Sequence, residues 1–189
     1  MSEKGSVIGE RARGMGWRAA YIVAALAVYL SDQATKAWAV RRLRFGDALK
    51  FLGGEVQFAY AENTGIAFSR LQGGGEFGRW MLATLAALAI VGLLLYFFRT
   101  RRTDDRILGA IALLLAGVAG NLTDRVRLGH VVDFIQVFIG SYPWPTFNVA
   151  DAAICTGAAL LALDLILEGR AEGRRRAAES GQSVVTNDG

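Results

Sequence analysis

The sequence WMLATLAALAIVGLLLYFF, residues 80–98, contains no charged side chain. A helix needs about 20 apolar residues to cross the roughly 30 Å hydrocarbon core of a bilayer, so this run is long enough to span it. A second run, ILGAIALLLAGVAGNLT at residues 107–123, is also uncharged. Apolar residues are therefore gathered in blocks rather than spaced as in an amphipathic helix or strand, which favours a membrane protein over a soluble domain.

Two further apolar segments lie on either side of this pair. Residues 19–30 are apolar throughout, and residues 147–167 carry only two charges, at Asp151 and Asp164. Both segments fit spans with polar residues near an end, where a charge costs less than at the bilayer centre. The sequence thus predicts a mainly α-helical membrane protein, a bundle of four transmembrane helices within residues 19–168.

Basic residues flank these spans and predict the topology. By the positive-inside rule the flanks are cytoplasmic, which places residues 1–18 and an irregular tail at residues 169–189 in the cytoplasm. The flanks also account for the net charge of +4, so no nucleic-acid surface is needed. Arg41, Arg42 and Arg44 depart from the rule, because they follow the first span on the outer side. The cytoplasmic flanks comprise Lys4, Arg11, Arg13, Arg18, Arg99, Arg101, Arg102, Arg106, Arg170, Arg174, Arg175 and Arg176.

The longest connection between predicted spans covers residues 41–78. Its middle part, residues 45–68, is rich in β-favouring residues and is interrupted by glycines. Irregular backbone is not tolerated in contact with lipid, so this segment is predicted to lie outside the membrane. We expect a small extracytoplasmic sheet or hairpin that covers the outer mouth of the bundle.

Two aspartates stand out against apolar surroundings. Asp133 lies in the sequence VVDFI, and Asp151 lies in FNVAD, on either side of a short loop between two hydrophobic segments. An antiparallel pair of spans would bring both carboxyl groups to one face of the bilayer. The apolar neighbours of Asp133 are expected to raise the pKa of its carboxyl, because burial disfavours the charged form. Two facing carboxyls that share a proton are the pattern of aspartic proteases. Alternatively, Asp151 serves only in a capping box, with Asn148 as the N-cap of the last helix.

The remaining polar residues of the spans have structural interpretations of their own. Asp32 and Lys36 are four residues apart, as in a local helical ion pair, or they point into the bundle beside the aspartates. Asp124 falls near a helix C-terminus, where we expect Arg125 or Arg127 to compensate its charge, which makes it a structural acid. With one cysteine and one histidine in the chain, a metal site has little support.

Five sequence blocks resemble the lipoprotein signal peptidases, also called type II signal peptidases, which are membrane aspartyl proteases. The resemblance runs from about Ser31 to Leu167, and it departs from the family pattern at Glu62, where an aromatic is expected, and at Ala116. The blocks, in the order of the family, are DQATK at residues 32–36, NTGIAF at 63–68, GNLTDR at 120–125, VVDF at 131–134 and FNVAD at 147–151.

The resemblance implies a catalytic pair, Asp133 and Asp151, and a bacterial inner-membrane enzyme whose site lies near the outer face. The implied substrate is a diacylglyceryl-modified prolipoprotein, cut before its lipidated cysteine. We expect a monomer in contact with membrane lipid, without a cofactor, a metal or a nucleic-acid partner. The residues implied to line or shape the site are Asp32, Lys36, Asn63, Gly117, Asn121, Arg125, Asn148 and Ala150.

Two other functions use the same carboxylates. Intramembrane ionisable residues often form a proton or ion relay, so a small multi-pass transporter or channel subunit is the main alternative. A non-catalytic membrane scaffold, in which the acids only cap helices and form ion pairs, is the second. The motif blocks favour the peptidase over both.

Overall fold

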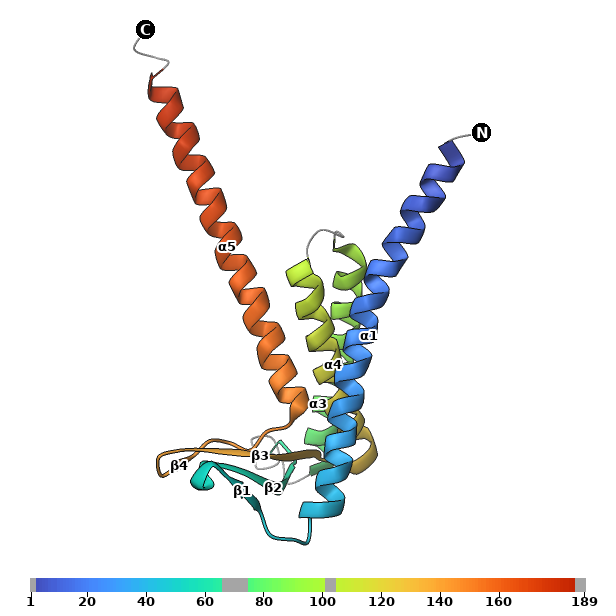
Figure 1. Cartoon of the computed structure of the whole chain (residues 1–189), viewed down its shortest axis with the longest axis vertical. Helices are drawn as coiled ribbons and strands as arrows, with labels where there is room; N and C mark the ends of the chain where they lie inside the picture. The colour runs from blue at the N-terminus through green and yellow to red at the C-terminus, as the bar shows by residue number, and fades with distance from the viewer. Residues whose placement is uncertain (1–2, 66–74, 101–104, 186–189) are drawn as a thin grey trace.

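The computed structural model describes residues 3–65, 75–100 and 105–185, and within these it consists of long helices and a small antiparallel sheet (Figure 1). Both described ends of the chain lie at one end of the bundle, and the sheet lies at the other. The helix α1 runs beside α4, while α5 diverges from the bundle toward its C-terminus. The helices are α1 (Glu3–Leu43), α3 (Gly75–Arg99), α4 (Asp105–Leu128) and α5 (Val149–Val185).

Three helices are long and apolar enough to cross a membrane, at Glu76–Arg99, Asp105–Leu128 and Val149–Arg174. They correspond to the second, third and fourth predicted spans, which are confirmed by length and composition. The described part of α1 does not reach the same apolar content, because Asp32 and Lys36 interrupt it. A membrane crossing by α1 therefore stays a prediction, although α1 packs along α4.

The sheet contains more of the chain than the sequence predicts. Its order is β1–β2–β3–β4, all antiparallel, with β1 (Leu49–Phe51), β2 (Val56–Asn63), β3 (Val131–Ile139) and β4 (Tyr142–Pro143). A 3₁₀ turn, η1 (Leu52–Gly54), joins β1 to β2. The predicted small sheet is present, but the stretch around Asp133 is a strand within it rather than the edge of a span. The β-branched and aromatic residues of VVDFIQVFI suit a strand, and the pairing with β2 settles it.

A local signal at the end of α4 explains where the chain turns toward β3. Gly129 has φ +85° and donates its backbone N–H to the Arg125 carbonyl at 3.2 Å, so it ends α4 as a C-terminal glycine cap.

The α5 helix runs without a break from Val149 to Val185. Residues 169–185 are thus helical, and the prediction of an irregular tail is wrong for this part.

An apolar cluster holds the sheet against the end of α1. The buried residues Ala39 and Phe134 belong to it, and three rings meet edge to face around Trp38. The ring centroids of Trp38 and Phe58 are 5.8 Å apart, and those of Phe58 and Phe134 are 6.0 Å apart. Edge-to-face pairs of this kind add to the free energy of burial. The cluster fixes β3, and with it Asp133, beside α1 and at the ends of the spans.

Candidate active site

Asp133 lies on β3 in a buried position, and two amide groups contact its carboxyl. Asn148 Nδ2 donates to Oδ1 at 2.7 Å, and Asn63 Nδ2 donates to Oδ2 at 3.1 Å. Burial, and then the charge of Asp151, raise the pKa of Asp133 to about 6, against the opposing effects of the two amides and Lys36. The carboxyl therefore holds a proton at a pH where an ordinary aspartate has lost it.

Asp151 lies in the first turn of α5 and forms the predicted capping box. Its backbone N–H donates to Asn148 Oδ1 at 2.9 Å, and its Oδ2 accepts the backbone N–H of Asn148 at 3.1 Å. Its other oxygen accepts a hydrogen bond from Asn121 Nδ2 at 2.8 Å. The capping interpretation is thus confirmed as geometry, and the Asp151 carboxylate is oriented by two N–H donors, from the Asn148 backbone and the Asn121 side chain.

Asn148 connects the two aspartates. Its side chain is 0% exposed, and its amide contacts Asp133 while its backbone and Oδ1 contact Asp151. The same Nδ2 also lies 3.2 Å from Asn121 Oδ1 and 3.3 Å from the Val132 carbonyl. Burying an amide without hydrogen bonds costs free energy of desolvation. The contacts of Asn148 with α4, β3 and α5 therefore fix the position of its side chain.

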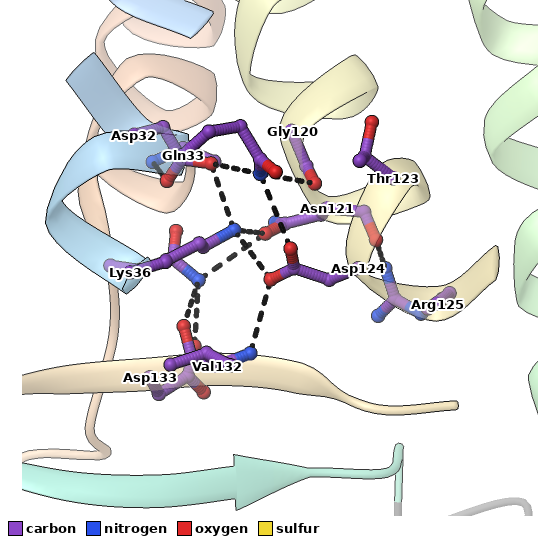
Figure 2. Close-up of polar contacts among 12 residues, drawn as sticks. Asp32, Gln33, Lys36, Gly120, Asn121, Thr123, Asp124, Arg125, Val132 and Asp133 are labelled. Carbon is purple, nitrogen blue, oxygen red and sulfur yellow. Dashed lines mark hydrogen bonds and ion pairs between the residues drawn. The ribbon is translucent and has the colours of Figure 1, made fainter. Parts of the chain in front are cut away.

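A buried cation organises the wall behind these residues. Lys36 Nζ lies 2.9 Å from Asp32 Oδ2, 3.0 Å from Asp124 Oδ2 and 2.9 Å from Asn121 Oδ1 (Figure 2). Lys36 is 3% exposed and Asp32 is 0% exposed. Both sequence interpretations of the Asp32 and Lys36 pair therefore hold, because the local ion pair points into the bundle. Asn121 accepts a hydrogen bond from Lys36 and donates one to Asp151, so it links the buried cation to that carboxylate.

The compensation of Asp124 differs from the sequence prediction. Lys36, from α1, makes the ion pair that was expected from Arg125 or Arg127. Asp124 also accepts the backbone N–H of Val132 at 3.2 Å, which ties the end of α4 to β3 beside Asp133. The Arg125 guanidinium instead donates to the Asn121 carbonyl at 3.4 Å (Figure 2). Asp124 is structural, as predicted, but with a partner that lies 88 residues earlier in the chain.

Small residues let the helices meet closely at the site. Asp32 Oδ1 accepts the backbone N–H of Ala150 at 2.9 Å, so α1 holds the start of α5. A Cβ on Gly120 would lie 2.5 Å from Asp32 Oδ2. A Cβ on Gly117 would collide with the Ala150 carbonyl oxygen and lie 2.7 Å from Ile154 Cγ1. Gly117 and Ala150 therefore shape the site through close packing rather than through side-chain chemistry.

Two positioning residues were not assigned to the site from sequence. Gln33 donates to the Gly120 carbonyl at 3.3 Å and to Asp124 Oδ1 at 3.2 Å, and a polar side chain between Asp32 and Lys36 was the available signal. Arg79, at the start of α3, donates to the Arg125 carbonyl at 2.8 Å. No local signal marks Arg79, because its partner lies on another helix. Of the block at residues 63–68, Asn63 reaches Asp133, while residues 66–68 lie outside the described residues.

The chain is similar to known proteins over a range that includes the site residues described above. A family model described as Signal peptidase (SPase) II matches residues 24–167. The chain belongs to the signal peptidase II family. It is 37% identical over 147 residues to a lipoprotein signal peptidase of Syntrophus aciditrophicus, which covers 77% of this chain and 91% of the relative. It is 42% identical over 141 residues to a lipoprotein signal peptidase of Geobacter sulfurreducens, which covers 74% of this chain and 86% of the relative.

The fold comparison agrees with the family. A solved bacterial membrane enzyme superposes with a TM-score of 0.71 and 29% identity, over 78% of this chain and 92% of the other. Membership in the signal peptidase II family confirms the resemblance found in the motif blocks. The chain is thus a membrane peptidase of the signal peptidase II family, and the transporter or ion-relay alternative is not favoured.

Proposed function

We propose that the chain is an aspartic endopeptidase in which Asp133 and Asp151 act together on one water molecule. The observation that carries the proposal is the position of Asn148, which donates its side-chain N–H to Asp133 and its backbone N–H to Asp151. One buried residue thereby sets the relative orientation of two carboxyl groups from different elements. Fixed orientation of this kind is what general acid–base catalysis requires.

The two carboxyls have different surroundings, which supports different roles. Asp133 is buried on β3 and its pKa is raised to about 6, so it is suited to carry the shared proton. Asp151 is less buried and accepts hydrogen bonds on both oxygens, from Asn121 and from the Asn148 backbone. This environment suits a carboxylate that accepts a proton from water.

In the proposed reaction, ionised Asp151 removes a proton from the water, and the water oxygen attacks the scissile carbonyl carbon. Protonated Asp133 donates a hydrogen bond to the carbonyl oxygen, which stabilises the negative charge that develops there. Asp133 then transfers its proton to that oxygen, giving a neutral diol. The diol collapses as the C–N bond breaks, the amine leaves with the proton held by Asp151, and Asp133 recovers the proton from the second hydroxyl. The pair returns to its starting protonation state.

The proposed substrate is a diacylglyceryl-modified prolipoprotein, cut just before its lipidated cysteine. The position of the site supports this, since Asp133 and Asp151 lie at the sheet end of helices that are long enough to span a bilayer. A substrate helix in the membrane would present its end to the carboxyls while its acyl chains stay in lipid. We place the site at the outer face of the bacterial cytoplasmic membrane, with both termini in the cytoplasm and one chain sufficient for activity.

A cleavage assay in detergent tests the dyad. Purified protein is given the lipidated prolipoprotein and its unlipidated form, and release of the signal peptide is followed by gel shift. Asp133→Asn and Asp151→Asn should each lose at least about 1000-fold in rate, because either change removes the shared proton chemistry. Asp47→Asn, at an exposed aspartate, is the matched control and should keep full activity.

The same assay can refute the proposed dyad and the proposed substrate. A folded Asp133→Asn or Asp151→Asn protein that cleaves at the wild-type rate would exclude the dyad. Equal cleavage of the unlipidated substrate would leave a signal peptidase but refute the proposed requirement for diacylglycerol. Thermal unfolding of each variant separates a loss of chemistry from a loss of folding.

A further inference from the structure

A pocket of about 260 Å³ opens between α1 and α4, behind the wall of the active site. Its inner surface includes Lys36 and Asp124, and its lining within the described residues includes neither Asp133 nor Asp151. Arg41 from α1 and Arg127 from α4 lie at the same pocket. Two arginines from different helices, both exposed, therefore line a cavity to which the proposed reaction gives no role.

The charges of this pocket, which we call the α1–α4 pocket, favour an anion. Lys36 lies 3.0 Å from Asp124 and 2.9 Å from Asp32, and these three charges form one buried cluster. The remaining charges of the lining are those of the exposed residues Arg41 and Arg127. In the described part of the chain neither arginine has an ion-pair or hydrogen-bond partner. Arginine presents a planar fork of N–H donors that matches phosphate oxygens, so a phosphate ester is the anion that this pair suits best.

Helix electrostatics alone do not explain this arrangement. A cation in the last turn of a helix interacts favourably with the macrodipole, and Arg41 and Arg127 both occupy last turns. However, Arg42 in the same turn of α1 and Arg125 in the same turn of α4 already provide such a cation without lining the pocket. The macrodipole therefore gives no reason for two arginines to meet at one cavity.

The position of the pocket indicates a lipid rather than a soluble phosphate. The α4 helix is long and apolar enough to span a membrane and ends at Leu128, a pocket residue that is 49% exposed. The pocket therefore lies at the depth of the lipid phosphates at the sheet end of the bundle. Its volume falls below the roughly 300–1,000 Å³ of sites that enclose a drug-sized ligand, so it accepts a headgroup and leaves the acyl chains in the bilayer.

We propose that the α1–α4 pocket binds the phosphate headgroup of an anionic phospholipid. Basic pockets between transmembrane helices on the cytoplasmic side recognise lipid headgroups. This pocket lies instead at the sheet end, where the positive-inside rule disfavours arginine. Its inner wall also supports the active site, because Lys36 contacts Asn121 and Asp124 holds the Val132 backbone. A bound headgroup should accordingly stabilise the folded protein. The proposal does not depend on the roles proposed for Asp133 and Asp151.

Lipid binding to the full-length protein in detergent is the test. Native mass spectrometry and thermal unfolding are measured with dioctanoyl phosphatidylglycerol, with dioctanoyl phosphatidylcholine and with inorganic phosphate. Wild-type protein should bind phosphatidylglycerol at least about tenfold more tightly than phosphatidylcholine, with a rise in Tm. The double variant R41Q/R127Q should lose at least about tenfold in phosphatidylglycerol affinity, whereas R42Q, at an exposed arginine outside the pocket, should bind as wild type does.

Four results would overturn the proposal, of which three concern the variants and phosphatidylcholine. These are unchanged affinity in the double variant, an equal loss in R42Q, or equal binding of phosphatidylcholine. Inorganic phosphate that competes fully at the same concentration would reject the lipid as the occupant. Retained cleavage of the lipidated substrate shows that the double variant is folded. If cleavage is lost, R41Q and R127Q are measured separately, and each should weaken binding more than R42Q does.

Discussion

Lys36→Met removes a cation that lies between two buried carboxylates. Asp32 and Asp124 are 2.9 and 3.0 Å from the Lys36 ammonium, and both are almost fully buried. Methionine keeps much of the apolar stem, so the change acts mainly on charge. Removing one partner of a buried ion pair costs about 3–5 kcal/mol, because the other charge stays buried and unpaired. Since two acids lose their partner here, we expect a loss of about 5 kcal/mol, the upper end of that range.

A double-mutant cycle separates this charge effect from lost packing. Asp124→Asn alone removes one ion pair but keeps an oxygen that can accept the Val132 N–H. In the double variant with Lys36→Met, Asp32 is the buried carboxylate that remains, and the Ala150 backbone N–H still reaches it. The two changes together should therefore cost at least about 1 kcal/mol less than the sum of the single changes.

The free energy of unfolding is measured by titration with sodium dodecyl sulfate in mixed micelles, with helical circular dichroism as the signal. Lys50→Met, at an exposed position on β1, is the matched control and should change stability by no more than about 0.5 kcal/mol. A Lys36→Met protein within about 1 kcal/mol of this control, or a strictly additive cycle, would refute the buried charge network as a source of stability.

Two further predictions concern the dyad and the helix contact behind it. Because the pKa of Asp133 is raised to about 6 and Asp133 acts as the acid, kcat/KM should fall as the pH rises through this region. Asn63→Ala removes an N–H donor that lowers this pKa, so the fall should move to higher pH; a pH–rate profile that does not move, or moves down, contradicts the assignment. Gly117→Ala forces a Cβ against the Ala150 carbonyl and should cost about 1–3 kcal/mol in unfolding free energy together with much of the activity, whereas Gly92→Ala, which meets nothing within 4 Å, should do neither. Equal effects of the two glycine changes, measured by thermal unfolding and cleavage, would show that the close approach of α4 and α5 is unimportant.

The sequence was sufficient for features whose causes are local. The spans around residues 80–98, 107–123 and 147–167 follow from uninterrupted apolar length, which any helix in lipid requires. The capping box of Asn148 and Asp151 depends on a separation of three residues and was found in place.

Features that depend on distant partners were found incompletely from sequence. VVDFIQVFI carries the composition of a strand, yet a short apolar run next to a predicted span has the same local pattern as the end of a helix. Its pairing with β2, across about 70 residues of chain, decided between them. Likewise the sequence shows that the charge of Asp124 needs a cation near it. It does not show whether Arg125 or Arg127, or Lys36 on another helix, provides that cation.

The sequence by itself determined that this chain has membrane-spanning helices, a small sheet and a set of acids and amides typical of one peptidase family. Only the tertiary structure decided that Lys36 neutralises Asp124, that Asn148 joins Asp133 to Asp151, and that Arg41 and Arg127 share a pocket. The physical reason is that the apolar length of a span and the capping of a helix depend on neighbours a few residues away. The partner of a buried charge depends instead on which helix faces pack together, and this is settled by close contacts such as that of Gly117 with Ala150.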